Sequence, residues 1–184
     1  MDDAGKTFFT FDCNPGGSDQ KYATNQQICR DFAREKDFGI WQEYTWADTW
    51  ELIELAAHAL LEFGVEVGDR VSIHSEDRPE WIILDLATVA VRGITVGLYP
   101  TNPTAEVEYL LNDSKGRGLI IEGQYLPILE EIRDKCPHLE KVITIGEEKP
   151  EGAIAFADLM AGGDDTPVTC EADMEDIAYI FYTS

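Results

Sequence analysis

The sequence predicts an α/β protein in which helices cover both faces of a parallel sheet. Short apolar runs typical of strands alternate with apolar stripes at helical spacing, in a β-α-β-α-β-α-β-α-β order between residues 42 and 145. Glycine or proline marks many of the boundaries, and the connections are short. This alternation favours parallel strands joined by right-handed crossover helices. Hydrophobic content of 44% with 10% aromatic residues is that of a globular chain.

The first strand and the first helix are predicted at 42–46 and 47–63. Thr45 and Asp48 have the spacing of a capping box, in which two side chains satisfy the free N–H groups of a helix start. The expected buried side carries Trp50, Ile53, Ala57, Leu60 and Leu61. The polar stripe carries Glu51, Glu54, His58 and Glu62. Gly64 is a natural stop, because glycine readily takes the left-handed conformation found at helix ends.

The later elements follow the same alternation. Strands are expected at 70–74, 94–99, 118–122 and 141–145. Helices are expected at 79–92, 103–114 and 124–135. Pro79 suits a first helical turn, where its missing N–H has no partner to lose. Asn102 is expected to cap the helix that Pro103 opens, and Gly93 is expected to end the helix before it.

The chain divides into four stretches by composition. They are an irregular leader (1–39), the α/β unit (40–146), an acidic, turn-rich linker region with a short helical piece near 156–160 (147–176), and a final strand with the residues after it (177–184). The strand itself is predicted at 177–182, where bulky apolar residues alternate. Because it follows a linker, we expect it to be the first strand of a second, incomplete sheet.

The charge balance is strongly acidic, with 14 Lys and Arg against 36 Asp and Glu, a net charge of −22 and a pI near 4.2. Such a field repels nucleic-acid phosphates and anionic lipid headgroups. We therefore expect no nucleic-acid partner and at most a peripheral association with membranes. A heavily solvated surface explains the acidity, and adaptation to high salt is the alternative hypothesis.

The four cysteines lie far apart and form no CxxC pair, so the spacing of a zinc site or a disulfide framework is absent. No signal peptide is visible at Met1–Asp3, and no apolar run reaches the roughly 18 residues of a membrane helix. A cytoplasmic location is the resulting expectation.

Two places could carry chemistry. His74 ends a strand and precedes Ser75, Glu76 and Asp77, but no nucleophile or second base stands at a fixed spacing, so a structural or surface role is favoured. The glycines form no GxGxxG fingerprint. We predict no catalytic residue and no metal ligand in this chain. The ending Tyr182-Thr183-Ser184 differs, because a strand that leads small hydroxyl residues into a loop can hold phosphate.

Three stretches, in this order and spacing, resemble the adenylate-forming (AMP-binding) acyl-CoA synthetases, and most closely the long-chain fatty acid–CoA ligases. They are Gly39–Asp48, Gly68–Ile73 with Asp77–Trp81, and Gly93–Pro103 with Glu106–Leu111. The phosphate loop of that family has the form Tyr-Thr-Ser-Gly-Thr-Thr-Gly-x-Pro-Lys-Gly. Here Tyr182, Thr183 and Ser184 match its first three positions, and its glycines and lysine are not present.

The resemblance implies a ligase that first joins a fatty carboxylate to the α-phosphate of ATP and then transfers the acyl group to the thiol of CoA. It implies ATP, Mg²⁺ and CoA as cofactors of the parent enzyme, with a long-chain fatty acid as substrate. Thr183 and Ser184 are the residues that it assigns to ATP, as the start of an incomplete phosphate loop. With the rest of the loop missing, we expect this segment to be inactive by itself and to bind none of these cofactors tightly.

Two alternatives stay open. One is a segment of a sister adenylating enzyme for another carboxylic acid. The other is a non-catalytic α/β binding module. A cut ligase segment would expose the apolar strand 177–182 and could self-associate through it, whereas a binding module would be a stable monomer.

Overall fold

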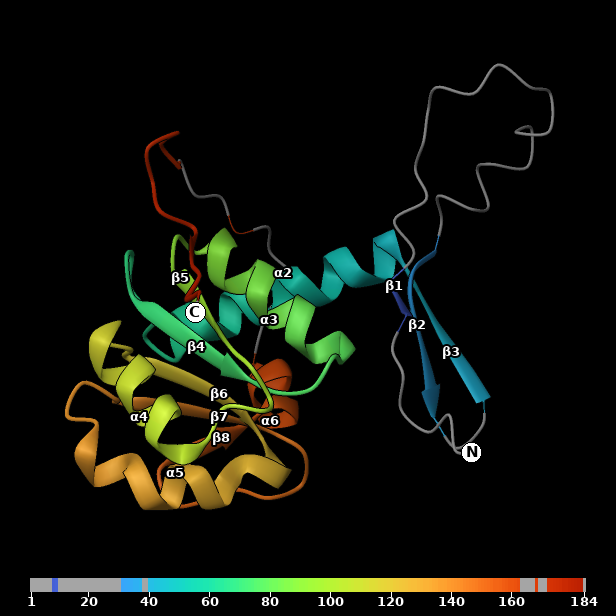
Figure 1. Cartoon of the computed structure of the whole chain (residues 1–184). Helices are drawn as coiled ribbons and strands as arrows, with labels where there is room; N and C mark the ends of the chain where they lie inside the picture. The colour runs from blue at the N-terminus through green and yellow to red at the C-terminus, as the bar shows by residue number, and fades with distance from the viewer. Residues whose placement is uncertain (1–7, 10–30, 38–39, 163–167, 169–171, 184) are drawn as a thin grey trace, which may run out of the picture.

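The computed structural model describes residues 8–9, 31–37, 40–162, 168 and 172–183, with the backbone alone for the first two ranges. It contains two sheets (Figure 1). A three-stranded antiparallel sheet has the order β1-β2-β3, with β1 at Phe8–Phe9, β2 at Asp31–Asp37 and β3 at Ile40–Thr45. This sheet lies beside the start of the first long helix.

The second sheet is parallel throughout and has the order β8-β7-β6-β4-β5-β9. Its strands are β4 (Arg70–His74), β5 (Ile94–Leu98), β6 (Gly118–Glu122), β7 (Lys141–Ile145), β8 (Ala153–Ala155) and β9 (Tyr179–Ile180). The parallel sheet covered by helices confirms the predicted fold class.

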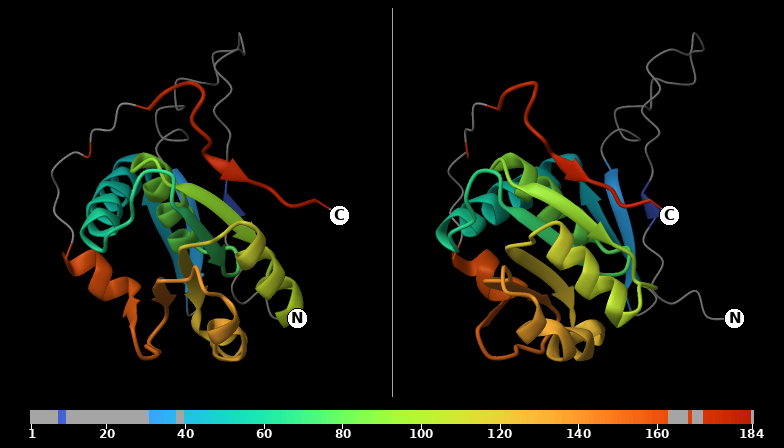
Figure 2. Two further views of the ribbon diagram at one scale, coloured as in Figure 1. Left: turned by 90° about the vertical axis from the view of Figure 1, so that its left-hand side faces the viewer. Right: turned by 60° about the vertical axis from the view of Figure 1, so that its left-hand side comes forward.

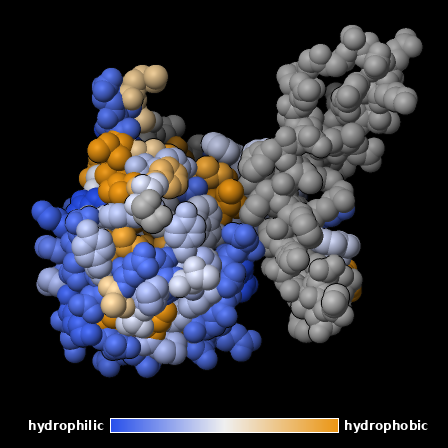
Figure 3. Space-filling view, in the orientation of Figure 1, coloured by the Kyte–Doolittle hydropathy of each residue, from blue (hydrophilic) through white to orange (hydrophobic). Residues whose placement is uncertain are grey.

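Helices cover both faces of the six-stranded sheet. One face carries α2 (Trp46–Glu62), α3 (Pro79–Ala90) and α6 (Phe156–Gly162). The other carries α4 (Thr104–Asp113) and α5 (Leu126–Ile132), the latter between the short 3₁₀ turns η2 (Gly123–Tyr125) and η3 (Arg133–Lys135). Hydrophilic residues dominate the surface over α4 and α5 (Figure 3).

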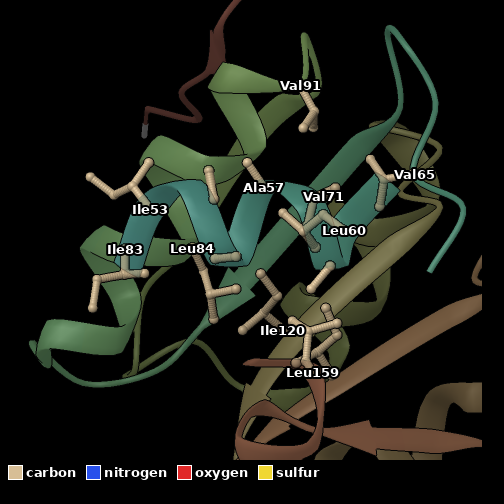
Figure 4. Packing of buried hydrophobic residues seen from close by; sticks show 14 of the residues in the cluster. Ile53, Ala57, Leu60, Val65, Val71, Ile83, Leu84, Val91, Ile120 and Leu159 are labelled. Atoms are coloured by element: carbon tan, nitrogen blue, oxygen red, sulfur yellow. The ribbon is translucent and has the colours of Figure 1, made fainter. Parts of the chain in front are cut away.

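Strand alternation divides the core into two layers. Ile73, Ile120 and Ile143 point to the face of α2 and α3, where Leu60 and Leu84 are completely buried (Figure 4). Their neighbours in β6 and β7 point to the opposite layer, under α4 and α5. Because side chains alternate across a strand, β6 and β7 each contribute apolar residues to both layers, whereas those of β4 lie in the first layer and those of β5 in the second.

Local chemistry explains the boundaries of α2. Thr45 Oγ1 accepts the Asp48 N–H at 3.1 Å, and Asp48 Oδ2 accepts the Thr45 N–H at 3.1 Å, so the predicted capping box is present. Gly64 follows the helix with a φ of +86°, the left-handed conformation that was expected there. The expected buried side was wrong at Trp50 and Leu61, which are 60% and 42% exposed. The face of α2 that packs against α3 and the sheet is narrower than the apolar stripe of the helix.

Two expected strand assignments need correction. The strand predicted at 42–46 pairs antiparallel with β2 and does not join the parallel sheet. The expected strand 177–182 is paired at Tyr179–Ile180, and these residues lie alongside β5 in the existing sheet (Figure 2). The expectation that it opens a second sheet is therefore wrong. This segment pairs with the edge of β5, and such a pairing between distant segments cannot be predicted from the periodicity of the sequence.

Other segments are more regular than expected. Residues 31–37 of the expected irregular leader form β2, and 153–155 of the expected linker region form β8. The helical piece predicted near 156–160 is confirmed by α6. Asn102 does not cap α4, since Pro103 holds the N-cap position without a side-chain hydrogen bond. Within the part of the chain that the structure describes, no helix is both long and apolar enough to cross a membrane.

Candidate functional site at the carboxyl edge of the sheet

A cavity of about 530 Å³ lies where β5 and the C-terminal segment end. Its lining residues are Gly97, Tyr99, Thr101, Asn102, Glu106, Tyr109, Leu110, Tyr182 and Thr183. They come from β5, the turn after it, α4 and the residues after β9. Open parallel sheets bind ligands in the crevice at the carboxyl ends of their strands, and this cavity has that position and a suitable size.

The turn between β5 and α4 forms one wall of the cavity. The Asn102 N–H donates to the Tyr99 carbonyl at 2.9 Å and closes this turn. Asn102 is 8% exposed, and its Oδ1 has no hydrogen-bond partner among the described residues. Tyr99 and Tyr109 also line the cavity and are largely exposed.

The C-terminal segment forms another part of the lining. Tyr182 donates its hydroxyl to Asp113 Oδ2 of α4 at 2.8 Å. Burial, followed by the Asp113 carboxylate, raises the pKa of Tyr182 to about 12. Ile180 and Tyr182 pack against the core layer under α4 and α5, so alternate residues of the segment hold it in place. The next residue, Thr183, is therefore presented at the cavity.

Of the two residues predicted to bind ATP, Thr183 lines the cavity and is exposed. Ser184 lies outside the described residues. Glu106 is the one charged residue in this lining, so the described lining offers hydroxyl groups, that of Thr183 among them, but no cation for a phosphate. The described residues contain no group of three or more His, Cys, Asp or Glu that could hold a metal ion.

A second polar cluster lies at the same edge of the sheet, at the ends of β4 and β6. Glu122 Oε2 accepts from Ser75 Oγ and from the Glu76 N–H, each at 3.0 Å, and Oε1 accepts from Arg78 Nη1 at 3.1 Å. Burial alone would raise the pKa of Glu122, but these donors together hold it below its ordinary value. One carboxylate thus fixes the 75–78 loop that leads into α3.

His74 belongs to this cluster as a structural residue. Its ring is completely buried and stacks on Tyr125 with centroids 4.4 Å apart and an interplanar angle of 17°. Burial lowers the pKa of His74, although nearby backbone carbonyls and the carboxylates of Glu122 and Glu76 oppose this. A neutral, stacked ring with no exposed surface agrees with the structural role predicted for it.

Sequence reasoning missed Glu122 and Asn102 as edge residues. The partners of Glu122 lie 44 to 47 positions earlier in the chain, so no local motif joins them. One available signal was that Glu122 ends a predicted buried strand, where ligands and loop contacts collect.

Comparison with known proteins identifies the family. A model of the AMP-binding enzyme family matches residues 21–184. The long-chain-fatty-acid–CoA ligase FadD15 of Mycobacterium bovis is 33% identical over 150 residues, which are 79% of this chain and 25% of that protein. The 3-hydroxybenzoate–CoA/4-hydroxybenzoate–CoA ligase of Thauera aromatica is 30% identical over 128 residues, 69% of this chain and 24% of that protein.

Solved structures agree in fold. The anthranilate CoA ligase AuaEII, in complex with anthranoyl-AMP, superposes with a TM-score of 0.74 at 31% identity, over 78% of this chain and 28% of that one. A long-chain-fatty-acid-CoA ligase from Archaeoglobus fulgidus gives 0.71 at 21% identity, over 77% of this chain and 28% of that one. The chain spans about a quarter of the length of the curated relatives FadD15 and the hydroxybenzoate ligase. The chain belongs to the AMP-binding enzyme family, whose matched members are acyl-CoA ligases.

Proposed function

We propose that the chain is the N-terminal part of an ATP-dependent long-chain fatty acid–CoA ligase. In the first step a fatty carboxylate oxygen attacks the α-phosphorus of ATP, the bond to the β-phosphate bridging oxygen breaks, and acyl-adenylate and pyrophosphate result. In the second step the CoA sulfur attacks the acyl carbon, and AMP leaves with the carboxylate oxygen. The observation that carries this proposal is the placement of Thr183 at the cavity, in a chain 33% identical to FadD15.

In this proposal Thr183 and Ser184 begin the loop that contacts the ATP phosphates. A hydroxyl and backbone N–H groups at the end of a strand suit an anion. The described wall holds Glu106 and no cation, so this wall by itself does not neutralise a triphosphate. Mg²⁺, when bound, would supply charge stabilisation at the phosphates. We therefore propose that the 184-residue chain alone is inactive and binds ATP, Mg²⁺ and CoA weakly.

A second candidate substrate class is aromatic carboxylic acids. The hydroxybenzoate ligase of Thauera aromatica and the anthranilate ligase are each about as similar to this chain as FadD15 is, at 30% and 31% identity. The three tyrosines of the cavity would suit a planar ring, since aromatic side chains stack favourably.

The proposed setting of the enzyme follows from its charge. A net charge of −22 on this chain disfavours nucleic acids and anionic membranes, so we propose peripheral membrane contact at most. We also propose a cytoplasmic location, in agreement with the widely spaced cysteines. Ile177 and Phe181 are 63% and 78% exposed, and they support self-association of this chain through the C-terminal strand.

Acid-dependent exchange of labelled pyrophosphate into ATP tests the proposal. The protein encoded by the complete reading frame that contains this sequence is assayed with palmitate, 4-hydroxybenzoate and no acid, alongside the 184-residue chain. We expect palmitate-dependent exchange in the first protein and background in the second. Exchange with 4-hydroxybenzoate alone would support the aromatic class, and exchange with neither acid would contradict both.

A further inference from the structure

Asp85 is a buried carboxyl group at the junction of three elements. It lies on α3, is 5% exposed, and its Oδ2 is 3.4 Å from the hydroxyl of Tyr179 on β9. Its Oδ1 has no hydrogen-bond partner within the described part of the chain. Thr95 of β5 lies close by and opposite Tyr179 in the ladder, and its buried hydroxyl also falls outside hydrogen-bond geometry. An apolar residue would suit this position better unless the carboxyl group has a task, because burying a polar group is costly.

The backbone holds β9 through few contacts. Two residue pairs join it to β5, and the Thr95 N–H donates to the Ala178 carbonyl at 2.9 Å. Besides the packing of Ile180 and Tyr182, polar side chains add three contacts to this segment, namely Asp176 to Arg92 at 2.8 Å, Tyr182 to Asp113 at 2.8 Å, and Tyr179 to Asp85. The first two lie at the surface, where ion pairs and hydrogen bonds contribute little. In the third, the Asp85 carboxyl group is buried.

We propose that Asp85 is a positioning residue, which together with Tyr179 fixes β9 against β5 and so sets where Thr183 meets the cavity. Thr183 follows Tyr179 by four residues along the same segment, so a displacement of Tyr179 displaces Thr183. The role of the Thr183 position in catalysis rests on the proposed function, whereas the docking of β9 against β5 does not depend on it.

The protonation of Asp85 gives this docking a signature. Burial raises the pKa of Asp85, against smaller opposite effects of Thr95 and Tyr179. Tyr179 on β9 is the titratable group in contact with it, and Thr95 on β5 is the neutral polar group. The Tyr179 hydroxyl on β9 lowers this pKa, so its contact favours the ionised carboxyl, and docking strengthens as the pH rises through the pKa of Asp85.

Hydrogen exchange of the Thr95 amide, followed by NMR on the 184-residue chain, measures the docking directly because its acceptor is on the C-terminal segment. We expect Asp85→Ala to speed this exchange roughly tenfold relative to the amides of β6. Asp85→Asn keeps an oxygen that accepts from Tyr179, and Tyr179→Phe removes the donor. We expect Asp85→Asn to keep most of the wild-type protection that Asp85→Ala loses. Tyr179→Phe should lose part of it. Asp134→Ala, at an exposed aspartate, is the matched control.

The pH profile separates positioning from simple packing. After correction for intrinsic exchange, the protection of Thr95 in the wild type should increase as the pH rises through the pKa of Asp85, whereas Asp85→Asn should show a flat profile. Equal protection in Asp85→Ala and Asp134→Ala would overturn the proposal, as would identical profiles in wild type and Asp85→Asn. If Asp85→Ala does not fold, Asp85→Asn and Tyr179→Phe still decide. No nucleotide is needed, so this test and the pyrophosphate-exchange test of the ligase function can fail independently.

Discussion

Glu122 and Arg78 are joined across the carboxyl edge of the sheet, with Oε1 of the carboxylate 3.1 Å from Nη1 of the guanidinium. The other carboxylate oxygen binds the hydroxyl of Ser75 and the N–H of Glu76. The strand end of β6 therefore fixes the loop between β4 and α3. This loop belongs to one of the stretches on which the family resemblance depends.

Glu122→Ala should reduce the free energy of unfolding by about 2 kcal/mol, because it leaves the Ser75 and Glu76 donors without their acceptor and Arg78 without one of its partners. Urea denaturation measures this. Glu122→Gln keeps an acceptor, so its free energy of unfolding should lie between those of the wild type and of Glu122→Ala. Glu131→Ala, at an exposed position on α5, is the control and should change little. Equal effects of Glu122→Ala and Glu131→Ala would refute this role.

Acid should destabilise the chain through His74. The buried ring resists protonation, so the pKa of His74 is lowered, while in the unfolded chain the ring titrates near 6.5. The unfolded state therefore binds more protons as the pH falls below that value, and stability declines, by about 1 kcal/mol between pH 7.5 and 5.5. Urea denaturation across this range should show a smaller slope for His74→Phe. The exposed His138→Gln should keep the wild-type slope, and an unchanged slope in His74→Phe would contradict the prediction.

Lys141 stabilises the end of α2 from the neighbouring strand β7. Its Nζ donates to the Phe63 carbonyl at 2.7 Å and lies 5.1 Å from the centre of the Phe63 ring. Lys141→Met should cost about 1 kcal/mol, because a cation near the C-terminus of a helix is lost together with its hydrogen bond. Thermal denaturation compares it with Lys149→Met, which removes an exposed ion pair with Asp158 and should cost less. A larger loss of stability in Lys149→Met than in Lys141→Met would contradict this role of Lys141.

Self-association should depend on the exposed apolar residues of the segment 177–182, which contains β9. Ile177 and Phe181 are exposed, and Phe181 stacks on Tyr179 with centroids 5.6 Å apart. Light scattering in high salt, which screens the acidic repulsion, should find oligomers of the wild type and monomers of Phe181→Lys. Met174→Lys changes an equally apolar, 97% exposed residue outside the strand and should still associate. A monomeric wild type would disprove the prediction.

Local chemistry in the sequence was enough to predict much of the fold. The capping box at Thr45, the left-handed Gly64 and the alternation of strands and helices each depend on residues a few positions apart. The pairing of β9 with β5 could not be predicted, because it joins residues 84 positions apart (Thr95 and Tyr179). The same holds for the partners of Glu122.

Of the residues that line the candidate site, only those of the C-terminal segment were predicted. Tyr182 and Thr183 were found through the family resemblance, and the structure places both at one cavity. The part of the lining with Asn102 and Tyr109 was not predicted, because a cavity between two segments leaves no periodic pattern in either; Asn102 was expected to cap a helix.

The most direct test concerns Thr183 in the protein from the complete reading frame. Thr183→Val removes the hydroxyl at the proposed phosphate contact, and Thr101→Val makes the same change elsewhere in the same cavity. In the pyrophosphate-exchange assay we expect Thr183→Val to lose roughly tenfold or more in kcat/KM for ATP, since one lost donor to a reacting phosphate is costly. Thr101→Val should stay close to wild type. Wild-type kinetics in Thr183→Val, or equal losses in both variants, would contradict the assignment of this edge of the sheet to ATP.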